Sequence, residues 1–173
     1  MSRVLGISCS GEVANLCVLE GDNAENVVIK LDGPERLEPV AAGDMGDAYA
    51  RTEAQATSAL GVIKPDVVTL LLPEGGNLTK QPHSVWTPRI ATETLLLLAA
   101  GRLGIPVEVM NRATVRARLD VTGKLELIVK DLDGTGKYWK DRGLAYLAAK
   151  AIFVQADEKG WPKHREPYTG ATP

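Results

Sequence analysis

The feature that most constrains the fold is a series of three short apolar runs within the first 31 residues. They cover Val4–Ile7, Ala14–Leu19 and Asn26–Leu31 and are rich in β-branched side chains. Gly11 separates the first two runs and Gly21-Asp22-Asn23 precedes the third, and both separators are typical of tight turns. The pattern predicts three antiparallel strands joined as a meander.

The remainder of the chain alternates predicted helices with predicted strands. Asp44 is expected to cap a helix that ends near Leu60, and the run Val67–Leu72 is apolar on both faces, as in a buried parallel strand. A loop is expected over residues 73–88. Thr87-Pro88 at its end predicts the start of the next helix, over Arg89–Leu103. The other expected elements are a strand Val107–Met110, a short helix capped by Asn111, a segment Leu125–Leu132 for which helix is favoured over strand, and a helix Lys137–Ala156.

This order predicts an α/β fold with a five-stranded mixed sheet, in which three antiparallel strands are followed by parallel ones and helices cover both faces. With 173 residues and 45% hydrophobic content, we expect one domain over residues 1–156 and a polar, proline-rich tail over 157–173. The longest apolar run, Leu95–Ala100, is too short to span a bilayer, so no membrane partner is expected. Cys9 and Cys17 lie in predicted strands, which favours reduced thiols in a cytoplasmic protein.

The charge is distributed unevenly along the chain. Residues 1–79 contain 5 basic and 12 acidic side chains, a net charge of −7, whereas residues 80–173 contain 15 and 10, a net charge of +5. A solvated surface explains this asymmetry as well as a phosphate-binding surface does. The charge pattern alone therefore leaves both interpretations open.

Several segments together resemble the RuvC Holliday-junction resolvase branch of the ribonuclease H-like superfamily. The family's first strand reads like ILGIDPG, and this chain has VLGISCSG. The resemblance covers roughly Val4 to Phe153 and depends on the order and spacing of the segments, because no single one is specific. Actin-like kinases and glycoprotease-like carbamoyl-transfer proteins rank second, because EGGNLTKQ lacks their glycine-rich phosphate turn. The other segments that carry the resemblance are PDVVTLLLPEGGN, RIATETLLLLAAGRLGIPVEVMN, RATVRARL and WKDRGLAYLAAKAI.

The resemblance implies a catalytic site at three positions. The aspartate that ends the family's first strand falls at Ser8, the glutamate after its fourth strand at Glu74, and an aspartate of the last helix at Asp141. Nucleases of this fold use two Mg²⁺ or Mn²⁺ ions roughly 4 Å apart, held by converging carboxylates. Glu74 and Asp141 are the expected metal ligands, and the neutral Ser8 hydroxyl predicts that a central ligand has been lost.

Other residues offer substitutes or contacts to nucleic acid. Glu12, Asp131 and Asp133 are acidic residues that could replace the missing ligand, although none falls at the family's position. Each basic or aromatic candidate also has an ordinary structural explanation, such as a solvated helix face or a loop anchor. The residues expected to contact nucleic acid are Arg112, Arg116, Arg118, Lys80 and Trp86, and His83 is a loop residue for which no chemistry is favoured.

Three functions follow from these expectations. The first is a RuvC-like protein that binds DNA or RNA, forms a homodimer and is weak or inactive as a metal-dependent nuclease. The second is a non-enzymatic dimeric assembly subunit on the same fold. The third is an active endonuclease with a rearranged metal site built from Glu74, Asp141 and either Glu12 or Asp133. The strand 67–72 is expected beside the strand 4–7, which would bring Ser8 and Glu74 to neighbouring strand ends.

Overall fold

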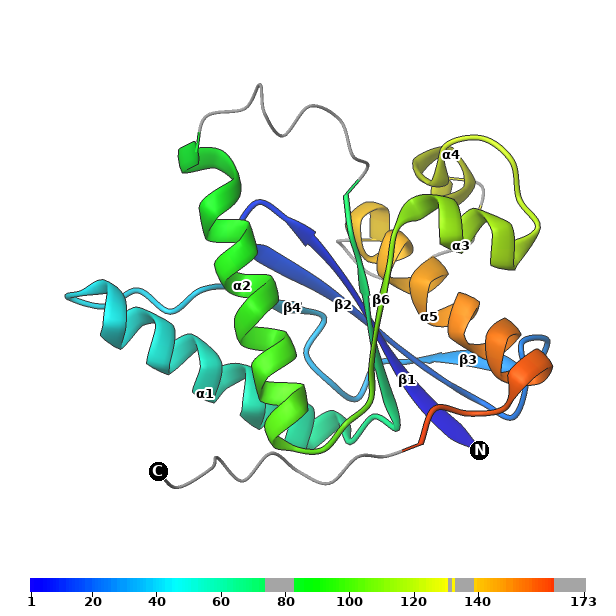
Figure 1. The fold of residues 1–173 in the computed structure, drawn as a ribbon, viewed down its shortest axis with the longest axis horizontal. Coiled ribbons are helices and arrows are strands. Elements are labelled where there is room, and N and C mark those ends of the chain that lie inside the picture. The colour runs from blue at the N-terminus through cyan, green and yellow to red at the C-terminus, as the bar shows by residue number, and fades with distance from the viewer. Residues whose placement is uncertain (74–82, 131, 133–138, 164–173) are drawn as a thin grey trace.

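A computed structural model describes residues 1–73, 83–130, 132 and 139–163, with backbone alone for residues 83–86 and Lys140. The described part is an α/β structure with one central sheet between two groups of helices (Figure 1). The strands are β1 (Ser2–Ser10), β2 (Val13–Gly21), β3 (Val27–Lys30), β4 (Arg36–Leu37), β5 (Val67–Leu71) and β6 (Val107–Met110). The helices are α1 (Met45–Ile63), α2 (His83–Arg102), α3 (Arg112–Leu119), α4 (Leu125–Lys130) and α5 (Trp139–Lys159).

The sheet has the predicted mixture of directions. Its order is β3-β2-β1-β5-β6, with β4 paired to β2 outside this path. The pairs β1–β2, β2–β3 and β2–β4 are antiparallel, whereas β1–β5 and β5–β6 are parallel. The expected neighbour of the first strand is confirmed, because β5 pairs with β1 in a register that sets Ser8 beside Leu71.

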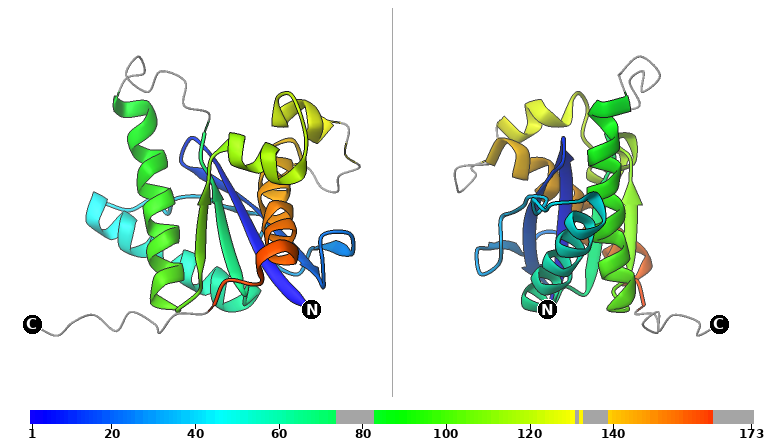
Figure 2. Two further views of the ribbon diagram at one scale, coloured as in Figure 1. Left: turned by 45° about the vertical axis from the view of Figure 1, so that its right-hand side comes forward. Right: turned by 90° about the vertical axis from the view of Figure 1, so that its left-hand side faces the viewer.

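Side-chain alternation along β1 divides the core between the two faces of the sheet. Val4 packs with α5 in one cluster, and Leu5 and Ile7 pack with α1 and α2 in the other. Successive residues of a strand point to opposite faces, so Ser8 faces α5, as Val4 does. Figures 1 and 2 show α1 and α2 on one face and α3, α4 and α5 on the other, which confirms the prediction of helices on both faces.

A glycine in β1 allows α5 to lie directly on the sheet. A β carbon at Gly6 would overlap the backbone carbonyl of Ala145, so only glycine fits at this crossing. Contacts of α5 extend over β1, β2 and β5. At its carboxyl end, the Asp157 carboxylate accepts a hydrogen bond of 2.9 Å from the Ala24 backbone N–H. The helix is therefore fixed at both ends of the sheet, and its first turn lies over the carboxyl end of β1.

Two helix starts agree with the sequence. The Asp44 side chain accepts a hydrogen bond from the Asp47 N–H at 2.9 Å, and the Asn111 side chain accepts one from the Thr114 N–H at 2.8 Å. Both are N-caps, which satisfy backbone donors that have no partner inside the helix. The choice of helix over strand for the segment 125–132 is confirmed, with α4 covering Leu125–Lys130.

Other boundaries differ from the predictions. The described sheet has six strands rather than the predicted five, because Arg36–Leu37, which lies outside every predicted strand, pairs with β2. The predicted start of α2 at Thr87-Pro88 is wrong, since the helix begins at His83 and contains Pro88. A proline inside a helix has a helical φ, but it removes one backbone hydrogen bond and crowds the preceding turn, so α2 continues through Pro88 at a local energetic cost. The last helix also continues beyond Ala156 to Lys159.

Among the described residues, no helix is both long enough and apolar enough to cross a membrane. Both cysteines are free thiols, with Cys17 buried in β2 and Cys9 half-buried near the end of β1.

Candidate functional site

A cavity of about 210 Å³ lies at the carboxyl ends of β1 and β5. Ser8 is 7% exposed and lies between Asn15 of β2 and Leu71 of β5 in the sheet register. The Asn15 side-chain amide donates a hydrogen bond of 3.2 Å to the Ser8 carbonyl. In open α/β sheets, ligands commonly bind outside the carboxyl ends of the strands. The lining residues are Ser8, Cys9, Ser10, Asn15, Leu71, Leu72, Pro73, Arg89, Arg112, Glu126, Asp141 and Leu144.

The structure brings Ser8 and Asp141 to the same cavity. Ser8 lies two residues beyond Gly6 on the face of β1 that α5 covers. Asp141 lies four residues, about one helical turn, before Ala145, which contacts Gly6. The helix and strand run in opposite directions, so the Gly6–Ala145 crossing brings the first turn of α5 above Ser8. Asp141 itself is exposed at the cavity.

Arg112, at the start of α3, enters the cavity from one side and forms an ion pair with Glu126 of α4. Burial opposes the ionisation of Glu126, but the hydrogen bond from Arg112 and its positive charge favour it, and the pKa of Glu126 lies below its ordinary value. The Nε atom of Arg112 is buried and has no hydrogen-bond partner among the described residues. The Nη1 atom of Arg112 is therefore paired with Glu126, whereas its buried Nε atom has no partner among the described residues.

Arg89, on α2, approaches the cavity from the opposite face of the sheet. Its Nε atom lies 2.7 Å from the Glu93 carboxylate, one helical turn along α2. Both groups act on Cys9: burial raises the pKa of this thiol to about 12, with Glu93 raising and Arg89 lowering it. The cavity wall therefore contains a neutral thiol at physiological pH rather than a thiolate.

Arg142, the residue after Asp141, anchors the first turn of α5. It is 1% exposed, and its Nε atom donates a hydrogen bond of 2.9 Å to the Leu16 carbonyl of β2. Its Nη1 atom lies 2.7 Å from the Glu35 carboxylate. A buried guanidinium with an ionic partner and a backbone partner resists displacement. Arg142 thus fixes the position of its neighbour Asp141 at the cavity.

The described residues do not fit a two-metal centre. They contain no group of three histidine, cysteine, aspartate or glutamate side chains that could hold a metal ion. Two carboxylates line the cavity, and one of them, Glu126, is paired with Arg112. Two divalent cations require several converging carboxylates. The described part of the cavity instead offers one unpaired carboxylate, that of Asp141, together with the neutral Ser8 hydroxyl and two arginines. This set of side chains differs from the converging carboxylates that hold two divalent cations.

Several residues predicted for the site fall outside this description. Glu74, the expected second metal ligand, lies outside the described residues, as do Lys80, Asp131 and Asp133. The backbone of His83 and Trp86 belongs to α2, so these residues are helical rather than in the predicted loop, but their side chains are not described.

The three arginines of α3 make separate contacts. Arg112 pairs with Glu126, Arg116 donates a 3.4 Å hydrogen bond to the Gly123 carbonyl, and Arg118 donates a 2.8 Å hydrogen bond to the Met110 sulfur. Only Arg112 lines the cavity. Residues 112 and 116 are one turn apart on one side of the helix, whereas 118 projects from a different side.

Sequence reasoning missed Asn15, Arg89 and Glu126 as lining residues. Arg89 and Glu93 have the spacing of a helical ion pair, which is a signal for the pair but not for a cavity. Asn15 could have been found from the hairpin, because pairing about Gly11 sets it opposite Ser8.

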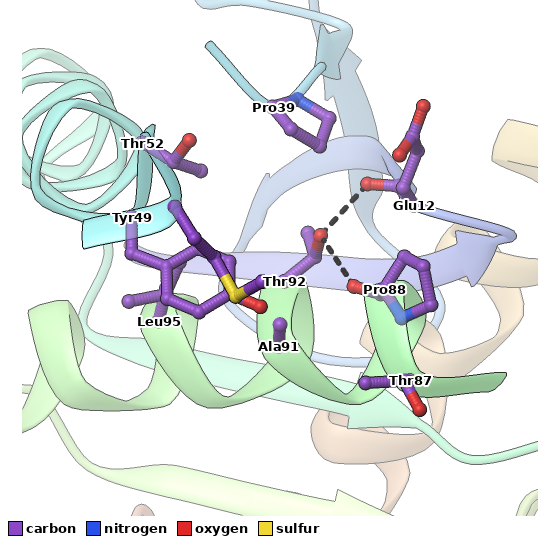
Figure 3. Close-up of a pocket in the computed structure, with 10 residues that line it drawn as sticks. Glu12, Pro39, Tyr49, Thr52, Thr87, Pro88, Ala91, Thr92 and Leu95 are labelled. Carbon is purple, nitrogen blue, oxygen red and sulfur yellow. Dashed lines mark hydrogen bonds between the residues drawn. The ribbon is translucent and has the colours of Figure 1, made fainter. Parts of the chain in front are cut away.

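Glu12, one of the substitute ligands, lies at a different pocket. That pocket lies between α1 and α2, and Figure 3 shows the Glu12 backbone carbonyl accepting a hydrogen bond from the Thr92 hydroxyl at 2.8 Å. Glu12 is not among the residues that line the cavity at Ser8.

Comparison with known proteins supports the fold. No protein-family model matches the sequence, and no curated protein matches it significantly. Among solved structures, RuvC of Thermus thermophilus bound to a Holliday junction substrate is similar with a TM-score of 0.68 and 15% identity, over 92% of this chain and 98% of that chain. A second Thermus thermophilus RuvC structure gives a TM-score of 0.66 and 18% identity, over 90% and 96% of the chains.

The yeast mitochondrial Holliday junction resolvase Ydc2 is also similar, with a TM-score of 0.62 and 17% identity, over 92% of this chain and 82% of that chain. Because all three identities are low, the likeness establishes the fold alone. The predicted ribonuclease H-like α/β fold, in its RuvC-like form, is thereby confirmed.

Proposed function

We propose that this protein binds nucleic acid on a RuvC-like fold and cleaves it weakly or not at all. The observation that supports this most directly is the composition of the cavity at the end of β1, where Ser8 lies with Arg89, Arg112 and a single unpaired carboxylate among the lining residues, Asp141. The similar RuvC structure contains a Holliday junction substrate, which makes branched DNA the first ligand to test.

The donors around the cavity suit a phosphodiester oxygen. The Nη atoms of Arg89 are not used by the ion pair with Glu93, and Arg112 lines the cavity while it is paired with Glu126. Ser8 and Ser10 add hydroxyl donors at the end of β1. Arginine binds phosphate through several N–H groups at once, and these contacts carry no sequence information. We therefore expect binding that depends on the shape and charge of the nucleic acid.

The same composition is unfavourable for metal-dependent cleavage. A hydroxyl at Ser8 supplies no negative charge, and the guanidinium groups of Arg89 and Arg112 repel a divalent cation. Glu74 and Asp141, if both reached one ion, would give it fewer anionic ligands than a two-metal mechanism needs. Mg²⁺ or Mn²⁺ remains the metal to test, and weak binding is the expected result.

Binding and cleavage can be measured in one titration. A labelled four-way DNA junction and a duplex of the same length are titrated with protein in EDTA, then in Mg²⁺ and in Mn²⁺, and the products are separated on a denaturing gel. We expect junction binding in EDTA that weakens as salt rises, with little or no cleavage in either metal. Arg112→Gln should weaken binding, whereas the matched control Arg51→Gln, an exposed arginine of α1, should not.

Two outcomes would replace the proposal. If no nucleic acid binds even at low salt, the non-enzymatic assembly subunit becomes the better account. If Mg²⁺ supports efficient cleavage that Asp141→Asn abolishes, the protein is an active endonuclease with a rearranged metal site.

A further inference from the structure

A second cavity, of about 460 Å³, lies between α1 and α2, on the face of the sheet opposite α5 (Figure 3). Tyr49 and Thr52 of α1 face Ala91, Thr92 and Leu95 of α2 across it. Pro39 and Glu12 close it above α2, as Figure 3 shows. The proposed nucleic-acid function uses none of these residues.

The hydroxyl groups of the two threonines in this cavity are already hydrogen-bonded to the backbone. The Thr52 hydroxyl donates to the Ala48 carbonyl at 2.8 Å and accepts from the Val40 N–H at 3.0 Å. The Thr92 hydroxyl lies 2.8 Å from the Glu12 carbonyl and 3.2 Å from the Pro88 carbonyl. Both side chains are therefore satisfied by backbone groups, and their methyl groups complete an apolar lining. Such a lining favours a hydrocarbon or aromatic group over a sugar or a phosphate.

The mouth of the cavity is unusually apolar for an exposed surface. Met45 is 69% exposed and Tyr49 is 39% exposed, one turn apart at the start of α1. Methionine adapts to the shape of a bound group, and tyrosine combines an apolar ring with a polar tip. Exposed apolar residues that border a concave site are typical of an interaction surface.

The charged groups at the rim are acidic. Glu12 lines the cavity, and Asp44 is adjacent to Met45. Among the described residues, neither carboxylate forms an ion pair, whereas Asp47 is paired with Arg51 and Glu38 with Arg36. The cavity therefore combines an apolar interior with two carboxylates at or next to its edge that have no ion-pair partner among the described residues, although Asp44 also caps α1.

From this complementarity we propose that the cavity binds an apolar side chain presented by a segment of a partner protein in which lysine or arginine flanks that side chain. The apolar group fills the space between α1 and α2, and the flanking cations meet Glu12 and Asp44. Burial of the apolar group supplies affinity, and the acidic rim selects the partner by charge.

Methionine labelling provides a direct measurement with internal controls. The chain has three methionines: Met45 at the cavity, Met110 at 1% exposure in the core, and Met1 at 81% exposure. With the methyl groups labelled with ¹³C, the protein is titrated with a blocked peptide Lys-Lys-Leu-Lys-Lys. We expect a saturable shift of the Met45 signal alone. The peptide Lys-Lys-Ser-Lys-Lys should bind at least about tenfold more weakly, because the leucine side chain accounts for that much of the affinity.

Variants of the rim test the electrostatic part. Glu12→Gln combined with Asp44→Asn removes both charges, and asparagine retains the capping ability of position 44. We expect the leucine peptide to bind several-fold more weakly and with a flatter salt dependence. The matched control is Glu25→Gln combined with Glu158→Gln, two exposed acidic residues away from the cavity, and it should bind like the parent.

Three results would overturn the proposal. The first is an unmoved Met45 signal at saturating peptide concentrations, or an equal response to the serine peptide. The second is equal binding by the rim variant and its control. The third is a Met45 signal that changes with protein concentration in the absence of peptide, which would assign the cavity to a second copy of this chain.

Discussion

Gly6 of β1 lies directly beneath the backbone carbonyl of Ala145 of α5, with no room for a β carbon between them. This contact fixes the distance between helix and sheet one turn from Asp141 and two residues from Ser8. The position of the candidate site thus depends on a glycine that lies outside it.

Gly6→Ala should destabilise the protein by about 1–3 kcal/mol or more, because the new methyl group must displace α5 or β1 in a packed core. Thermal unfolding measured by circular dichroism tests this. The matched control is Gly61→Ala in α1, where the new β carbon meets open space. That variant should be unchanged or more stable by up to about 1 kcal/mol, since alanine favours the helix. Equal stability of the two variants would contradict the close packing.

Arg142→Met should destabilise the protein by about 3 kcal/mol, because it removes the ion pair of a buried guanidinium with the half-buried Glu35 and leaves the Leu16 carbonyl without its donor. Arg102→Met is the control, since Arg102 forms an exposed ion pair with Glu53 and should cost no more than about 1 kcal/mol. Chemical denaturation at neutral pH measures both. A loss for Arg142→Met no larger than that for the control would show that Arg142 does not anchor α5.

The fold could be predicted from the sequence because its strongest signals are local. The turn at Gly11, the apolar strand after Pro65 and the caps at Asp44 and Asn111 each specify a backbone conformation within a few residues. Local signals fail where one pattern permits two conformations. Thr87-Pro88 favours a helix start, but a helix can also continue through a proline at an energetic cost, as α2 does between His83 and Arg102.

The candidate site was predicted only in part, because a cavity is assembled from distant segments. Ser8 and Asp141 were expected together from the resemblance, and the structure brings both to one cavity. Arg89 and Glu126 carry no signal beyond ordinary helical charges. Arg142 was missed for a related reason: in the segment WKDRG it reads as one charge on a solvated face, yet among the described residues it is the largest fully buried side chain.

The two thiols predict a loss of stability at alkaline pH. Burial raises the pKa of Cys17 to about 12, from an ordinary value near 9. The unfolded chain therefore releases this proton first, so the stabilisation is complete below pH 9 and is lost as the pH rises from 9 towards 12. In the Cys17→Ala variant, the free energy of unfolding should fall less between pH 8 and pH 10.5 than it does in the parent protein. Chemical denaturation at the two pH values measures it, and an unchanged difference would contradict a buried, neutral thiol.

The arginines of α3 should contribute unequally to nucleic-acid binding. Changing Arg112, Arg116 and Arg118 together to alanine should weaken binding and reduce the slope of log K against log salt by up to about three units, one for each phosphate contact. Arg118 projects from a different side of α3 and contacts the Met110 sulfur, so Arg118→Ala alone should change the slope least. Fluorescence anisotropy at four salt concentrations measures the slopes. A larger effect of Arg118→Ala than of Arg112→Ala would place the nucleic acid away from the cavity.

Restoring a carboxylate at Ser8 tests whether the cavity lost a metal site. Ser8→Asp adds a buried negative charge near Asp141, but Arg89 and Arg112 line the same space and offset it. Ser8→Asp combined with Arg112→Gln removes one of these cations and also releases Glu126 from its ion pair. Three carboxylates then line one cavity. They repel one another without a cation, so the double variant should be destabilised in EDTA and regain stability with Mn²⁺.

The comparison runs across four proteins, namely the parent, each single variant and the double variant, by calorimetry in EDTA and in Mn²⁺. We expect little rise in melting temperature with Mn²⁺ for the parent and for Arg112→Gln, a modest rise for Ser8→Asp and the largest rise for the double variant. Asp141→Asn in the double variant should abolish most of that rise, because Asp141 is the acidic residue that α5 brings to the cavity. If Mn²⁺ stabilises the parent as strongly as the double variant, the parent already binds the ion. The hypothesis of a lost metal site is then wrong, and the parent has an intact one. If Mn²⁺ stabilises none of the four proteins, the carboxylates do not converge, and the end of β1 never formed a metal site.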